Sequence, residues 1–326
     1  MIDHQAALFA RLRAPLPLTS PRGVLAANAR PAAPPRDAST VVLLRDAHGG
    51  GVEAYLVQRV RAMTFGGVYA FPGGRVDSAD NDPTVGNSAV GGSLGAVIGP
   101  NGPGPRLAHA LVCAAVRETF EECGVLLAAP TADAGRPLDL AGPEWLAERQ
   151  ALERRELGLG ELLARHGLAP RTDLLAPWAR WITPEVEPRR FDTWFFVAAL
   201  PPGQTPGELS GEADRMVWIR PQEALERHAA GTMPMLPPTA CVLADLLGQP
   251  SVAAVLAAAR DRVIAPIRPK IVIADGAVHF LLPHDPEYAT AAPSADSASS
   301  KAMLAVISRG RGHRAAVTAS TTVEQA

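Results

Sequence analysis

Three glutamates near the middle of the chain are the residues whose types and spacing best suit chemistry. Glu118, Glu121 and Glu122 lie in the segment RETFEECGV, residues 117–125. At ~100° per residue, a helix would place the three carboxylates within an arc of about 100° on one face. Hard oxygen ligands at this density suit Mg²⁺ or Mn²⁺, which bridge protein carboxylates to substrate phosphates. The alternative is an ordinary solvated helix face, where acidic triplets are also common.

The residues around the glutamates favour the metal-binding interpretation. Val116 and Phe120 fall on the opposite side of the helix and can pack on a core. Arg117 supplies a cation that offsets repulsion among the carboxylates. Gly124 follows the last turn, where glycine readily adopts the left-handed conformation that ends a helix. We therefore expect a helix over 107–123 with one apolar and one acidic face.

A glycine turn lies well upstream of this helix. The segment FPGGRVD, residues 71–77, contains Gly73 and Gly74, which would let the backbone approach a phosphate closely. A Pro-Gly-Gly turn alone has little specificity, because it is common in ordinary loops. Its combination with the acidic helix is more specific than either part.

Strands and helices alternate along the segments that must position these residues. The strand at 191–200 is apolar after Asp192, so we expect it at the centre of a sheet. Other strands are expected at 41–44, 53–59, 68–71, 178–182, 216–219, 270–274 and 277–282. Other helices are expected at 144–166, from 221 onward, at 238–248 and at 251–263.

Composition divides the chain into a domain and two tails. Residues 1–37 are rich in proline and alanine and predict an extended arm. A domain is expected over 38–285, with a flexible Gly/Pro-rich insertion at 81–106. Residues 286–326 have a composition that cannot bury a core, which predicts disorder.

Bulk properties narrow the class of protein. The 326 residues are 47% hydrophobic and carry a formal net charge of −2, which gives no electrostatic reason to expect a nucleic-acid partner. The three cysteines are too few and scattered for a disulfide framework. No signal peptide or membrane-spanning run is evident, so we expect a cytoplasmic protein. The oligomeric state stays open.

The glycine turn and the acidic helix together resemble the two halves of the Nudix box. That box has a glycine, five residues, a glutamate, seven residues, then Arg-Glu-x-x-Glu-Glu-x-Gly and an aliphatic residue. Gly74 fits the first glycine, and residues 117–125 fit the second half at every fixed position. Asp80 stands where the first glutamate is expected. Between Asp80 and Arg117 lie 36 residues where seven are expected, an excess of 29.

The interrupted box is similar to a branch of the Nudix hydrolase family, that of the mammalian peroxisomal coenzyme A diphosphatase. The resemblance implies an α/β/α sandwich with a mixed sheet, an insertion within the box and extra C-terminal helices. It implies that Glu118, Glu121 and Glu122 hold Mg²⁺ or Mn²⁺, and that Arg117 orients them by charge-assisted hydrogen bonds. Arg117, Glu118 and Glu121 would then form the catalytic set for hydrolysis of a diphosphate bond.

The resemblance also indicates a small-molecule substrate, coenzyme A or an acyl-coenzyme A. Gly73 and Gly74 would approach the substrate. Arg59 and Arg61 could meet its diphosphate or 3′-phosphate, or could pair with nearby acids. NADH, ADP-ribose and nucleotide sugars are alternative substrates, and a non-catalytic nucleotide-binding module is an alternative function.

Two further roles are left open by the sequence. A glutamate of the box, or an acid on another loop, would accept the proton from water, and Glu187 and Glu212 are candidates. Asp80 either has a secondary role in the glycine loop or is inert. The same two alternatives hold for Asp77 and Asp82.

Overall fold

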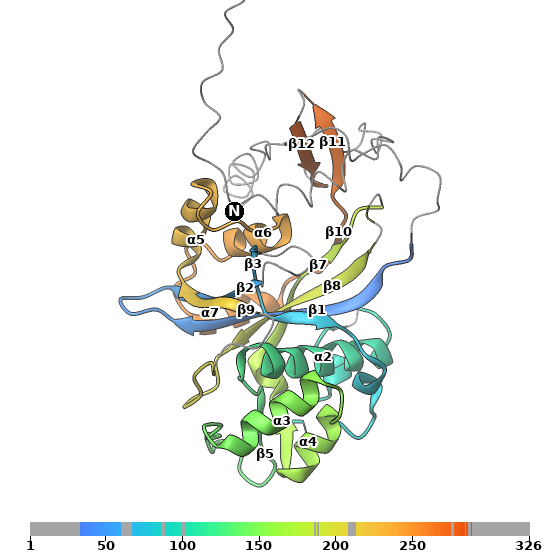
Figure 1. Cartoon of the computed structure of the whole chain (residues 1–326), viewed down its shortest axis with the longest axis vertical. Helices are drawn as coiled ribbons and strands as arrows, with labels where there is room; N and C mark the ends of the chain where they lie inside the picture. The colour runs from blue at the N-terminus through green and yellow to red at the C-terminus, as the bar shows by residue number, and fades with distance from the viewer. Residues whose placement is uncertain are drawn as a thin grey trace, which may run out of the picture.

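A mixed β-sheet crosses the middle of the molecule, with helices on both of its faces (Figure 1). The computed structural model describes residues 33–59, 67–85, 89–99, 102–185, 187, 189–207, 213–274, 277–283, 285 and 288. Within them the three layers form the predicted α/β/α sandwich.

The main sheet runs in the order β10-β7-β8-β1-β2-β3, with β4 also paired to β1 and β9 to β2. β8 lies between antiparallel β7 and parallel β1, which confirms the central place predicted for the apolar strand. The strands are β1 Arg36–Asp46, β2 Val52–Arg59, β3 Tyr69–Ala70, β4 Gly73–Arg75, β7 Leu175–Ile182, β8 Phe191–Ala199, β9 Ala213–Ile219 and β10 Pro266–Ile267. Two small antiparallel pairs lie outside it: β5 Ala128–Pro130 with β6 Leu168–Pro170, and β11 Lys270–Ala274 with β12 Ala277–Leu281.

The helices divide between the two faces (Figure 1). One face carries α2 Pro105–Cys123, α3 Pro143–Glu153 and α4 Leu159–Arg165. The other carries the extra C-terminal helices α5 Pro221–Ala229, α6 Pro237–Asp245 and α7 Val252–Arg260. Short 3₁₀ turns are η2 Ser78–Asn81, η3 Leu94–Ala96 and η4 Thr172–Leu174.

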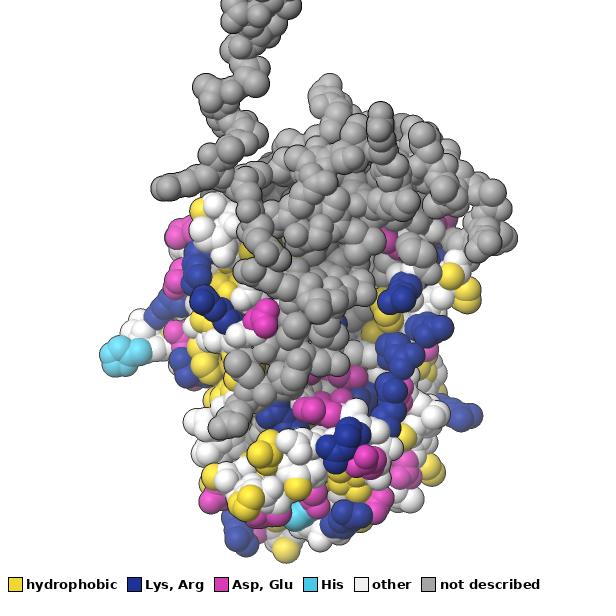
Figure 2. Space-filling model, viewed as in Figure 1, with side chains coloured by type: hydrophobic (Ala, Val, Ile, Leu, Met, Phe, Trp, Pro, Cys, Tyr) yellow, Lys and Arg dark blue, Asp and Glu magenta, His cyan; other side chains and the backbone are white. Residues whose placement is uncertain are grey.

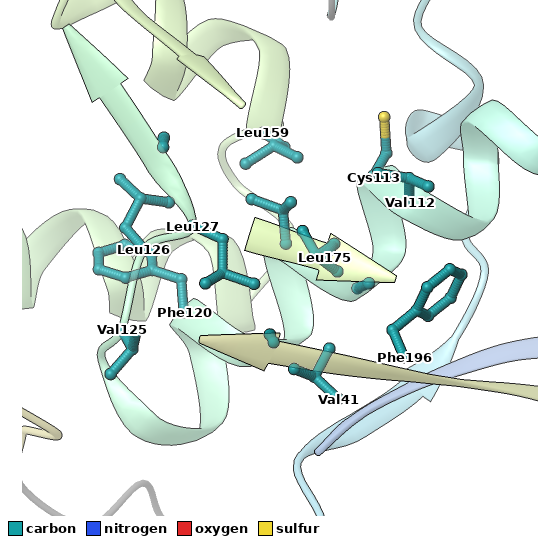
Figure 3. Packing of buried hydrophobic residues seen from close by; sticks show 14 of the residues in the cluster. Val41, Val112, Cys113, Phe120, Val125, Leu126, Leu127, Leu159, Leu175 and Phe196 are labelled. Atoms are coloured by element: carbon teal, nitrogen blue, oxygen red, sulfur yellow. The ribbon is translucent and has the colours of Figure 1, made fainter. Parts of the chain in front are cut away.

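Strand β1 shows how the sequence builds two cores. Its side chains alternate between faces, so Val41 and Leu43 join the cluster under α2 while Val42 and Leu44 join the opposite one. Figure 3 shows Phe120 of α2 beside Val125, Leu126 and Leu127, which follow the helix, while the strand residues Val41 and Phe196 belong to the same cluster. The apolar face of α2 therefore fixes the helix on the sheet.

The helix expected at 144–166 is in fact two helices, so that prediction was wrong. α3 ends at Glu153 and α4 begins at Leu159. Arg155 lies between them with φ +59°, a left-handed conformation that stops a helix.

The insertion is irregular, as predicted, but we did not expect its described part to be packed. Val85, Leu94 and Ile98 are buried in the cluster under α2. The Thr172 hydroxyl donates to the Val90 carbonyl at 2.7 Å, so the insertion is also tied to η4. Its flexibility stays a prediction.

The predicted domain boundaries can be compared only in part. β1 begins at Arg36, two residues before the expected start at 38, because it pairs with β8 from that point. Residues 1–32 of the predicted arm, and all of the predicted tail except Tyr288, lie outside the described residues. Among the described helices, none has the length and apolar character needed to span a bilayer.

Candidate active site

Helix α2 presents the acidic segment at its C-terminal end. It begins with Pro105, whose fixed φ suits the first turn, and ends at Gly124 with φ +68°. The Gly124 amide donates to the Phe120 carbonyl at 2.9 Å. These ends define α2 as a helix whose last two turns carry Arg117 and the glutamates.

The glycine turn lies directly against these glutamates, despite its distance in sequence. A Cβ built on Gly74 would lie 2.3 Å from Oε1 of Glu118, closer than any real contact. The Gly73 amide donates to Oε2 of Glu122 at 3.0 Å. The two halves of the predicted box therefore meet in one site.

The close pairing of β4 with β1 also requires a glycine at position 73. β4 pairs with the start of β1, opposite Thr40. A Cβ on Gly73 would lie 2.4 Å from the Ser39 carbonyl oxygen and 2.6 Å from the Thr40 Cα. Gly73 thus lets this segment pair closely with β1, and Gly74 lets it lie against the acidic helix α2.

Asp80 takes a defined role that the sequence left open. Its side chain is 1% exposed, and it accepts two hydrogen bonds from Arg117, Nε to Oδ1 at 2.9 Å and Nη2 to Oδ2 at 3.0 Å. Its Oδ2 also accepts from the Asp77 amide at 2.7 Å. Such bidentate pairing fixes the plane of the guanidinium. Asp80 therefore anchors Arg117, although it is one methylene shorter than the expected glutamate.

The free end of the Arg117 guanidinium holds two of the glutamates. Nη1 donates to Glu118 Oε1 at 2.9 Å and to both oxygens of Glu121 at 3.1 Å. Nη2 also donates to the Arg75 carbonyl at 2.9 Å, which ties the helix to the end of β4. Arg117 is thus the hub that connects the glycine turn, Asp80 and the acidic helix.

The carboxylates of this site outnumber its guanidinium. Burial raises the pKa of Glu118 to about 7; Arg117 opposes that rise and Glu121 adds to it. Burial also raises the pKa of Glu121, again opposed by Arg117. For Arg117, burial acts to lower the pKa, but the hydrogen bond to Asp80 and the neighbouring carboxylates raise it above its usual value.

Asp80 and the three box glutamates thus face one arginine, and this excess of buried negative charge suits a divalent cation. All of the donors are hard carboxylate oxygens. In the part of the chain that is described, the carboxylates turn toward Arg117 and Gly73 instead of converging in a group of three around one point. The set fits a metal in charge and chemistry, and Glu118, Glu121 and Glu122 are the side chains that would hold it.

Arg149 is a neighbour of the site that the sequence analysis missed. This α3 side chain is buried, and its Nε donates to the Glu121 carbonyl at 2.8 Å. It also lies beside Gly124, so it braces the end of α2. No pattern in the sequence relates it to a helix 28 residues earlier.

Of the other predicted residues, Asp77 touches the cluster through its backbone amide, which donates to Asp80. Arg59 lies at the end of β2, and Glu187 is in the β7–β8 connection. Asp77 accepts from Arg155 at 2.9 Å, and Asp82 accepts from Thr84. Arg61 and Glu212 lie outside the described residues. Their predicted roles stay predictions.

Comparison with known proteins places this geometry in a family. A family model described as the NUDT19 Nudix domain matches residues 105–246. The chain is 29% identical to the acyl-coenzyme A diphosphatase NUDT19 of Gallus gallus over 285 residues, 72% of this chain and 73% of that protein. It is 35% identical to the Homo sapiens protein of the same name over 137 residues, 39% of this chain and 36% of that one.

A solved structure agrees with the sequence comparisons. A NUDIX hydrolase from Alicyclobacillus acidocaldarius is 30% identical with a TM-score of 0.57, over 69% of this chain and 96% of that chain. The fold thus has a counterpart in a known hydrolase, and the chain belongs to the Nudix hydrolase family, with relatives in its NUDT19 branch.

Proposed function

We propose that the protein hydrolyses the diphosphate bond of coenzyme A or an acyl-coenzyme A with the help of Mg²⁺ or Mn²⁺. The observation that carries the proposal is the contact of the Gly74 backbone with Glu118 inside a group of partly buried carboxylates. A site with backbone open to a phosphate and oxygen ligands for a cation suits a diphosphate. The products would be adenosine 3′,5′-diphosphate and a 4′-phosphopantetheine.

The residues of the site would divide the work. Glu118, Glu121 and Glu122 would hold the metal, which when bound polarises the diphosphate and activates a water. Arg117 holds Glu118 and Glu121 in one orientation, and Asp80 holds Arg117. This positions the ligands before substrate arrives, which avoids reorganisation during the reaction.

The substrate assignment rests on the relatives that the chain resembles. The chicken and human relatives are named acyl-coenzyme A diphosphatases, which favours coenzyme A for this chain as well. Arg59 and Arg61 are candidates to meet its phosphates, and Nε of Arg59 is buried without a hydrogen-bond partner in the described part of the chain. Glu187 and Glu212 are candidates to accept the proton from water.

The test is hydrolysis by the purified full-length chain with MgCl₂ or MnCl₂. Coenzyme A, an acyl-coenzyme A, NADH, ADP-ribose and a nucleotide sugar form the panel, and products are identified by mass. We expect turnover of the coenzyme A compounds, lost by at least 100-fold in Glu121→Gln and Glu122→Gln. Glu223→Gln, on the exposed face of α5, is the control.

The outcomes separate the alternatives. Turnover that persists in both variants would contradict the metal assignment. Preference for NADH, ADP-ribose or the sugar would keep the chemistry and change the substrate. Binding of coenzyme A with no turnover of any compound would identify a non-catalytic module.

A further inference from the structure

A second feature of the structure is a cavity that adjoins the carboxylate cluster at Arg75 and Asp77. This cavity of about 720 Å³ opens between the start of β1, the segment after β4 and the first turn of α2. Its walls carry the guanidinium groups of Arg36, Arg75 and Arg106. Figure 2 shows Lys and Arg side chains gathered on the same side, where β1 begins and α2 has its N-terminal end.

Two of these arginines have no counter-charge. Among the described residues, neither Arg36 nor Arg106 makes a side-chain hydrogen bond or ion pair. Several other arginines of the described chain do pair with carboxylates, as Arg180 does with Asp192 at 2.6 Å. An arginine without a partner at a cavity wall is free to bind an anion.

The acids of the cavity do not neutralise it. Asp77 is shared between Arg75 at 3.6 Å and Arg155 at 2.9 Å. Asp37 is the second acid, so two carboxylates face three guanidinium groups. The first turn of the 19-residue helix α2, which has no side-chain cap, adds partial positive charge. The wall thus keeps an excess of positive charge.

The cavity is connected to the proposed diphosphate site by the backbone. Arg75 follows Gly74 directly, and its carbonyl accepts from Arg117. From Arg75 the cavity extends to Leu107, which is 11 residues and so about 16 Å along the axis of α2 from Glu118. Because the cavity begins at Arg75, next to Gly74, one ribose ring is enough to carry a phosphate from the diphosphate site into its near end. A nucleotide with its diphosphate at Gly74 could therefore place another phosphate in the cavity.

We propose that the cavity walled by Arg36, Arg75 and Arg106 binds the phosphate monoester on the ribose of the substrate. This inference rests on the proposed function, and it explains how the site would select coenzyme A. Coenzyme A carries a 3′-phosphate, which NADH and ADP-ribose lack. Arginine suits a phosphate monoester because its planar fork donates two parallel hydrogen bonds.

The test compares two substrates that differ only in this group, coenzyme A and 3′-dephospho-coenzyme A. We expect the full-length protein to prefer coenzyme A in kcat/KM. Arg36→Gln and Arg106→Gln should each lower kcat/KM for coenzyme A by about tenfold or more, mostly through KM, and leave the dephosphorylated compound within twofold. Both side chains are exposed, so folding should be retained. Arg154→Gln, at an exposed pair with Glu156, is the control.

A binding measurement without turnover keeps this inference separate from the proposed function. Calorimetric titration with adenosine 3′,5′-diphosphate and with adenosine 5′-monophosphate should give tighter binding of the first, and the two variants should remove the difference. That result would support a phosphate-binding role for the cavity even if neither coenzyme A compound were hydrolysed. An unchanged substrate ratio and an unchanged binding difference in both variants would overturn the proposal. If only Arg59→Gln removed the preference for coenzyme A over its dephosphorylated form, the proposal would also be overturned, and the phosphate would be assigned to the end of β2 instead.

Discussion

Gly74 leaves no room for a side chain beside Glu118, so a single methyl group added at this residue is enough to test the site. We expect Gly74→Ala to lower kcat/KM by about 100-fold, because its methyl group would displace the Glu118 carboxylate by about 1 Å or more. Steady-state kinetics would measure the loss. The control is Gly158→Ala, where an added Cβ meets nothing within 4 Å and φ is −92°. Equal activity in the two variants would contradict the proposed role of this contact.

Asp80 is expected to support both stability and activity. Asp80→Asn removes the negative charge that faces the buried Arg117, and breaking a buried ion pair of this kind costs about 3 kcal/mol. The Tm should fall by about 6 °C or more in a domain of this size. Asp214→Asn, at an exposed position of β9, should change the Tm little. A Tm within 2 °C of the wild type would show that Asp80 is inert.

The raised pKa of Glu118 gives the metal-free protein a pH-dependent stability. Because this pKa is about 7 in the folded protein and 4.5 in the reference state, the folded chain binds more protons between these values. The Glu118 contribution to the free energy of unfolding should therefore fall as pH rises from 4.5 to 7, then level off.

Thermal unfolding in EDTA across this pH range would measure the effect. Glu118→Gln removes the titrating group, so the variant should gain stability relative to the wild type at pH 8 and lose that advantage near pH 5. Parallel curves for the two proteins would rule out the assigned shift.

At the scale of elements, the insertion is expected to act as part of the core. Leu94 is 1% exposed, so Leu94→Ala should lower the free energy of unfolding by about 2–5 kcal/mol. Urea unfolding would measure it, with Leu146→Ala as the control, since that leucine is 46% exposed. A change below about 1 kcal/mol would mean that the insertion is only loosely attached.

The elements also show which parts of the structure the sequence could predict. The helix at 107–123 and the glycine that ends it follow from local patterns, and these patterns predicted the acidic face correctly. The break between α3 and α4 had a local signal in Gly158, which caps the start of α4, but the left-handed conformation of Arg155 had none, because arginine rarely adopts it. The packing of Leu94, and the link between Arg149 and Glu121, depend on residues far apart in sequence and could not be predicted from local spacing.

For the whole molecule, a bound cation should shift the folding equilibrium. Metal that binds only the folded chain stabilises it by about 2.7 kcal/mol at 100 times its Kd, which is about 5–11 °C in Tm. Thermal unfolding with MnCl₂ against EDTA should show this rise in the wild type and in Glu223→Gln. The rise should disappear in Glu121→Gln. An equal rise in all three proteins would place the cation elsewhere.

The pairing of Asp80 with Arg117 has a consequence for how the chain tolerates changes in length. Closing a loop of 36 residues instead of seven costs only about 1.5 kcal/mol more in chain entropy. One well-made buried contact at the ends of the loop can offset that amount. Lineages of this enzyme could therefore lengthen or shorten the exposed parts of the intervening segment, as long as these two side chains still meet and Val85, Leu94 and Ile98 keep their places in the core.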